Sequence, residues 1–181
     1  MATLVSLSFL LAGAVLAEEN EEKWLSHETR HTILHYKSAE DLKRFSHNID
    51  FSGGDDGFFV FRFSRDEEDT LEKTGDKVDA IFERAQEILD MRKNMQKVVV
   101  NIYHDSGALD TAFFQVYRQP CRIRAWYRYW NNTIYVNSRD IHAGMLAHEL
   151  AHAIIDHYMV VRPPRATAEI LARYVDEHLE R

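Results

Sequence analysis

His148-Glu149-Leu150-Ala151-His152 places two histidines four positions apart, with a glutamate directly after the first. On an α-helix, residues four apart project from the same face, so both imidazoles can reach one metal ion. Zinc is the usual occupant of such a pair, because it accepts neutral imidazole nitrogen and favours tetrahedral geometry. In motifs of this form the glutamate does not bind the metal but takes a proton from metal-bound water. The motif therefore predicts a helix that carries one zinc ion and a catalytic base.

The residues around the motif favour a buried helix. Positions 141–155 are apolar nearly all round apart from the motif itself, and they are rich in Ala, Leu and Met. Asp140 can cap the helix at its start, and Pro163-Pro164 set its outer limit. The alternative is that both histidines are buried and satisfied by carbonyl or carboxylate groups without a metal.

A zinc site of this type needs a third protein ligand and an open position for water. A third histidine six positions after His152 is excluded, because that residue is Tyr158, and His157 would point away from the ligand face. Residues 166–176 have a second helical pattern, and we place Glu169 in its first turn. Glu169 is therefore the candidate third ligand. Alternatively, it is a surface residue that the helix dipole favours.

The stretch from 133 to 178 resembles the gluzincin zinc metallopeptidases, and most closely the small peptidase MA-like proteins. The likeness is carried by H-E-L-A-H, a short proline-containing turn and A-E-I-L-A-R-Y-V-D. It implies that His148, His152 and Glu169 bind zinc and that Glu149 is the base. The chain departs from the family pattern in three ways. Only 16 residues separate His152 from Glu169, Ile170 stands where glycine is common, and Arg173 stands where thermolysin-like enzymes have an aspartate.

The resemblance also implies a fold and a way of holding substrate. It predicts an α+β, zincin-like domain in which a mixed or antiparallel sheet packs on the motif helix. Thr133–Asn137 would be an edge strand that holds an extended peptide by strand addition. Alternatively, it is an ordinary strand of the sheet. Tyr174 and His178 are candidates for stabilising the oxyanion, or plain helix-face residues. The competing function is a non-catalytic module of the cell envelope that binds extended peptides.

Composition and charge limit the partners of the chain. It has 181 residues, 45% of them hydrophobic, with a net charge of −7, which suits one globular domain and argues against nucleic-acid binding. Arg122, Arg124 and Arg128 alternate with aromatic residues and predict one basic strand face. We interpret this face as solvated, with the alternative that it lines a cleft and attracts acidic groups. The expected partner is a peptide or protein substrate.

The N-terminus has the pattern of a secretory signal. Residues 4–16 are apolar, and Val15 and Ala17 fit a cleavage site that is followed by an acidic stretch. We expect residues 1–17 to be a signal peptide and 18–181 a single domain, secreted or periplasmic, with no membrane span after cleavage. The alternative is an uncleaved N-terminal anchor. A single cysteine, Cys121, permits no internal disulfide and suits a bacterial envelope.

The remaining elements follow from hydrophobic periodicity. We predict strands at 31–36, 58–63 and 97–104, and helices at 39–47, 76–91 and 107–117.

Overall fold

The computed structural model describes residues 23–50 and 67–180. The predicted signal peptide and the predicted strand at 58–63 lie outside the described residues. Within the described part of the chain, no helix is both long and apolar enough to cross a membrane.

The described residues form an α+β fold with a mixed five-stranded sheet and five α-helices. In chain order the elements are β1 (Leu25–Glu28), β2 (Thr32–Tyr36), α1 (Ala39–Asn48), α2 (Glu67–Leu89), β3 (Val98–Tyr103), α3 (Ser106–Tyr117), β4 (Ala125–Arg128), the 3₁₀ turn η1 (Tyr129–Asn131), β5 (Thr133–Asn137), α4 (Ala143–Tyr158) and α5 (Arg165–His178).

The sheet has the strand order β1-β2-β3-β5-β4. The three inner strands, β2, β3 and β5, are parallel to one another, whereas β1 pairs antiparallel with β2, and β4 antiparallel with β5. The strand that precedes the motif helix, β5, is therefore interior, and all five of its residues are buried. The expectation that Thr133–Asn137 is the edge strand was wrong. A hairpin through η1 and Asn132, which has a left-handed φ of 47°, adds β4 outside β5 and makes β4 the edge.

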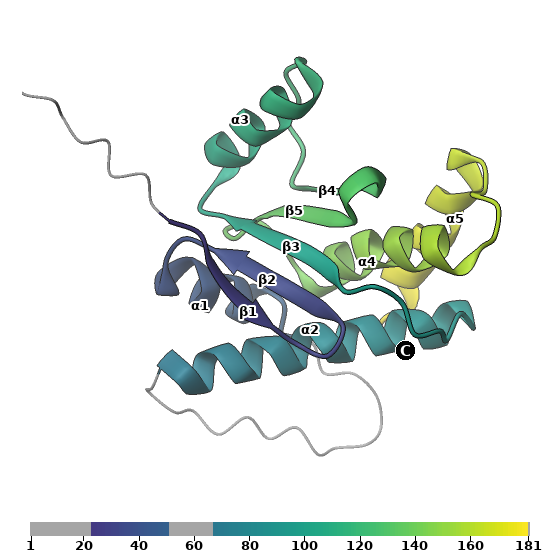
Figure 1. The fold of residues 1–181 in the computed structure, drawn as a ribbon, viewed down its shortest axis with the longest axis horizontal. Helices are drawn as coiled ribbons and strands as arrows, with labels where there is room; N and C mark the ends of the chain where they lie inside the picture. Colours follow the sequence, from purple (N-terminus) through teal and green to yellow (C-terminus); the bar gives the residue numbers. More distant parts are fainter. Residues whose placement is uncertain (1–22, 51–66, 181) are drawn as a thin grey trace, which may run out of the picture.

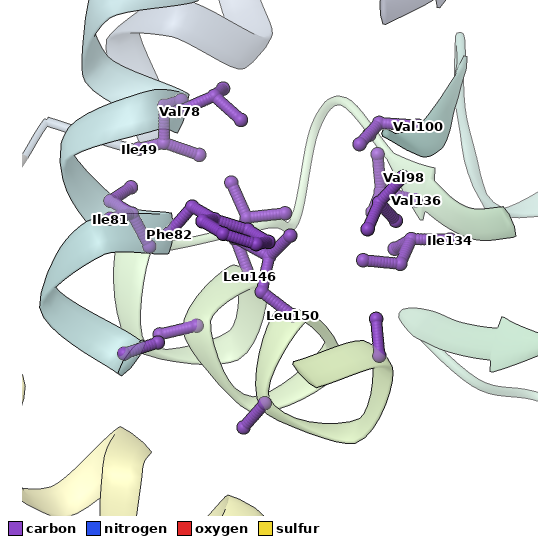
Figure 2. Packing of buried hydrophobic residues seen from close by; sticks show 14 of the residues in the cluster. Ile49, Val78, Ile81, Phe82, Val98, Val100, Ile134, Val136, Leu146 and Leu150 are labelled. Atoms are coloured by element: carbon purple, nitrogen blue, oxygen red, sulfur yellow. The ribbon is translucent and has the colours of Figure 1, made fainter. Parts of the chain in front are cut away.

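Helices cover the two faces of the sheet unequally (Figure 1). The helices α1, α2 and α4 lie on one face, where their apolar side chains and those of the inner strands form the main core. Figure 2 shows Leu146 and Leu150 of α4 packed between Phe82 of α2 and the valines of the sheet. On the other face, α3 covers a smaller cluster that includes Trp126 and Tyr135. The fifth helix, α5, packs on α4 and α2 rather than on the sheet.

The motif helix, α4, begins later than expected. His142, not Asp140, is its N-cap, because the His142 ring Nδ1 accepts the Met145 backbone N–H at 3.2 Å. Asp140 belongs to the turn after β5, where its backbone N–H donates to the Asn137 carbonyl. The helix ends at Tyr158, and α5 starts directly after Pro164, so the predicted helical segment at 166–176 is confirmed.

Most other predicted elements agree with the structure to within one or two residues. The exceptions are β1, which was not predicted, and α2, which begins nine residues earlier than expected. Helix α3 is capped by Asp105, whose Oδ1 accepts the Ala108 backbone N–H at 3.0 Å. This hydrogen bond lowers the pKa of Asp105.

Candidate metal centre

The two histidines of the motif face each other across one turn of α4. Their Nε2 atoms lie 3.3 Å apart, and both side chains are about four-fifths buried. Two neutral imidazoles at this separation can form only one hydrogen bond with each other, in which one Nε2 donates and the other accepts. Alternatively, both Nε2 atoms can present a lone pair to one metal ion between them.

Glu169 brings a carboxylate to the same point from α5. Its Oε2 lies 3.6 Å from His148 Nε2 and 3.7 Å from His152 Nε2. Its other oxygen, Oε1, is 3.7 Å from the exposed Arg165. Glu169 lies in the second turn of α5, not the first, so the alternative in which it serves the helix dipole does not hold. The structure thus brings together all three of the side chains that the sequence proposes as ligands.

The spacing of these three atoms suits a zinc ion. The three separations define a triangle whose circumscribed radius is about 2.0 Å, which matches the zinc bond lengths of about 2.0–2.2 Å to histidine nitrogen and carboxylate oxygen. Among the described residues, this is the one group of three or more His, Cys, Asp or Glu side chains with ligand atoms close enough to share an ion. Two nitrogens and one oxygen are a donor set that zinc accepts.

Glu149 follows His148 on α4 and is partly buried. Burial raises the pKa of its carboxyl group to about 8, and the nearby Glu169 charge also raises it, whereas a hydrogen bond from the Tyr127 backbone N–H opposes the shift. The contact with Tyr127 joins the motif helix to the edge strand β4. The sequence contained no sign of this contact, because it depends on which strand lies at the edge.

The surroundings of His152 favour its neutral form. Burial and the neighbouring His148 lower the pKa of His152, and a neutral imidazole is the form that binds metal. Asp156, one turn further along α4, has a side chain only 4% exposed and pairs with Arg162 at 2.9 Å. The Arg162 guanidinium also stacks over the Tyr129 ring at 4.6 Å. Sequence reasoning missed these contacts, which hold the turn between α4 and α5.

Several other candidate residues lie away from the centre. On α5, Tyr174 and His178 point about 140° and 180° from Glu169 at 3.6 residues per turn, and their rings stack on each other at 4.0 Å. Their directions and mutual stacking fit the alternative that both are plain helix-face residues. His157 turns toward the Tyr127 hydroxyl, 3.4 Å away, as its predicted orientation requires.

The predicted arginine stripe does not line the centre either. Only Arg128 lies within β4, and Arg122 and Arg124 precede the strand. Trp126 belongs to the cluster under α3, so alternation puts Arg124 and Arg128 on that face of the sheet, opposite α4. A cavity of about 540 Å³ against α3, lined in part by Asp110 and Arg122, also contains none of the three ligand candidates.

Comparison of the chain with models of protein families, with curated proteins and with solved structures finds no match. The function of the centre must therefore be argued from its geometry.

Proposed function

We propose that this chain is a zinc-dependent peptidase with a zincin-like domain of the gluzincin type. The observation that carries the proposal is the convergence of His148, His152 and Glu169, from two helices, on a point about 2.0 Å from each ligand atom. Glu149 follows the first ligand on the same helix and does not belong to this triangle, which leaves it free to act on a proton. Three ligands leave a fourth position open, as catalytic zinc sites require and structural ones do not.

In this proposal His148, His152 and Glu169 hold the ion, and zinc supplies a water of lowered pKa together with a polarised substrate carbonyl. Glu149 takes the proton from the attacking water at its carboxylate and passes it to the leaving amine. The Tyr127 backbone N–H orients this carboxylate through its hydrogen bond. Because that amide belongs to β4, this hydrogen bond connects the proposed base directly to the edge strand.

The open edge of β4 supports a peptide substrate. The Arg124 carbonyl accepts the Asn137 backbone N–H, so the strand directs the backbone groups of Ala125 and Tyr127 away from β5. Because Glu149 accepts the Tyr127 N–H, the Ala125 groups and the Tyr127 carbonyl are the ones that can pair with a peptide. An extended peptide can pair with such an edge through backbone hydrogen bonds, whatever its sequence. The edge packs against α4, which carries His148 and His152. A peptide on β4 would therefore run past the proposed zinc. In this role β4 replaces Thr133–Asn137.

A non-catalytic peptide-binding module is the second candidate. It is favoured by Arg173, which is exposed on α5 at the position where thermolysin-like enzymes have a supporting aspartate. Such a module would use the same open edge of β4 but would have no need of Glu149 as a base. We retain a secreted or periplasmic location as part of the proposal, on the pattern of residues 1–17 alone.

The test compares wild type with Glu149→Gln, using Glu177→Gln as a matched change at an exposed glutamate on α5. We expect about one zinc per chain by metal analysis in all three proteins. We expect cleavage of a library of unstructured fluorogenic peptides by wild type and Glu177→Gln, with at least about 100-fold slower cleavage by Glu149→Gln, because general-base catalysis is worth about 10²–10⁴-fold. Zinc binding without cleavage by wild type would favour the binding module. Equal rates in wild type and Glu149→Gln would show that Glu149 is not the base.

A further inference from the structure

A glycine on α4 lies directly against an aspartate on α5, beside the candidate metal centre. Gly144, His148 and His152 follow one another at intervals of four residues and so share one face of α4. On α5, Asp176 comes seven residues after Glu169, which is about two turns and returns it to nearly the same face. The two faces meet in antiparallel order, with Glu169 opposite the histidines and Asp176 opposite Gly144.

A side chain at position 144 would require the Asp176 carboxylate to move. A Cβ atom at this position would overlap Oδ1 of Asp176, well inside the 3.0 Å limit of real Cβ contacts, and would lie 3.3 Å from Cγ of Asp176 and 3.4 Å from Nδ1 of His142. Gly144 therefore lets the Asp176 carboxylate lie directly against the backbone of α4, and its φ is not in the positive range that favours glycine. The Asp176 carboxylate rests on the first turn of α4, where the positive end of the helix dipole favours a negative charge.

We propose that Asp176 and Gly144 are positioning residues that set the register of α5 on α4 and so hold Glu169 at the metal. This role rests on the proposed metal centre. It gives α5 two fixed points, since the Asp156–Arg162 pair holds the turn that enters the helix and Asp176 holds a point near its far end. In this proposal a side chain at residue 144 displaces α5 as well as the Asp176 carboxylate, and a shift of α5 moves Glu169 away from the metal, whose ligand distances hold to within about 0.2 Å.

The same geometry excludes Asp176 as a direct ligand. Asp176 packs at the level of Gly144, which is four residues, about 6 Å, from His148 along α4. Glu169, not Asp176, completes the group of close ligand atoms. An effect of Asp176 on zinc must therefore act through the position of Glu169.

The experiment measures zinc affinity by competition with a chromophoric chelator, together with the visible spectrum of the Co²⁺-substituted protein. The variants are Gly144→Ala, Asp176→Ala and the double variant. Gly107→Ala is the matched control, because Gly107 also stands second in its helix, and a Cβ there meets only Asp105 Oδ1 at 3.5 Å. We expect Gly144→Ala to bind zinc about 10–100-fold more weakly, which is the usual effect of losing a residue that supports a metal ligand. Gly107→Ala should bind zinc as tightly as wild type.

The double variant distinguishes positioning from a general loss of structure. Removing the carboxylate gives the new methyl group room, so the double variant should bind zinc as Asp176→Ala does and more tightly than Gly144→Ala. The Co²⁺ spectrum should change in Gly144→Ala and return toward the wild-type form in the double variant. Thermal unfolding followed by circular dichroism shows whether each variant is folded. If Gly144→Ala does not fold, the zinc affinities of the double variant and of Asp176→Ala decide. Equal affinities support the positioning role, and weaker binding by the double variant contradicts it.

Three results would overturn the inference. The first is wild-type zinc affinity and an unchanged Co²⁺ spectrum in Gly144→Ala. The second is a fold-loss of zinc affinity in the double variant equal to the product of the losses in the two single variants. The third is a loss of zinc affinity in Gly107→Ala equal to that in Gly144→Ala. Absence of zinc binding in wild type would instead refute the proposed metal centre, and this role with it.

Discussion

Replacing Glu169 by alanine should remove one of the three proposed ligands and leave only the two imidazoles. In the structure, Oε2 of Glu169 is nearly equidistant from the two Nε2 atoms, at 3.6 and 3.7 Å, so no other described carboxylate can take its place without moving α5. Loss of a residue that merely supports a ligand costs about 10–100-fold in metal affinity. Loss of the ligand itself should cost more than about 100-fold, which is about 2.8 kcal/mol at 1.4 kcal/mol per factor of ten.

The assay is zinc competition with a chelator series of graded affinity, at constant pH and ionic strength. Glu177→Ala is the control, because Glu177 is an exposed carboxylate on the same helix and should leave affinity unchanged. Glu169→Gln keeps the size of the side chain while removing its charge, so its affinity should fall between wild type and Glu169→Ala. Wild-type affinity in Glu169→Ala would refute the assignment, and loss in both alanine variants would show that the charge of α5, not one ligand, controls binding.

Three further predictions concern stability, measured by urea unfolding. Leu150→Ala should cost about 2–5 kcal/mol, since Leu150 is fully buried between α2 and the sheet; a cost below 1 kcal/mol would contradict this packing. Asp105→Ala should cost about 1 kcal/mol at pH 7 through the lost helix cap. Because capping lowers the pKa of Asp105 from 3.8, the cost should persist above that value and disappear as the pH falls toward 2; a cost unchanged at pH 2 would contradict it. Arg162→Ala should cost about 1–3 kcal/mol by leaving buried Asp156 unpaired, whereas the exposed Arg165→Ala should change stability by less than about 0.5 kcal/mol.

The helices of the centre could be predicted from the sequence because their signals are local. The i, i+4 spacing of the histidines, the apolar run around them and the double proline determine where α4 ends and α5 begins. Only six residues join the two helices, so the first turns of α5 must lie close to the end of α4. Glu169 was therefore predictable as the carboxylate nearest the motif.

The arrangement of strands could not be predicted in the same way. A strand that is buried on both faces can be interior or can be an edge covered by other elements, and the sequence of β5 is apolar in either case. Its position depends on whether β4 folds back onto it, which is a choice between non-local pairings. The interaction of Glu149 with the Tyr127 backbone depends on the same choice, so it was hidden for the same reason.

The choice between the two roles of Tyr174 and His178 is of a different kind, because the information that bears on it is local. Once Glu169 is assigned to the metal, helical geometry fixes which residues of α5 share its direction. Tyr174 and His178, five and nine residues later, point away from it. Asp176, seven residues later, points to within about 20° of the direction of Glu169. Asp176 therefore shares the face of α5 that carries Glu169, and Gly144, four residues before His148, is its counterpart on α4. A glycine within a helix lowers stability by about 1 kcal/mol relative to alanine, so a glycine on the ligand face indicates a close packing contact there. That contact is with the Asp176 carboxylate, and the pair links the helix register to the geometry of the proposed zinc site.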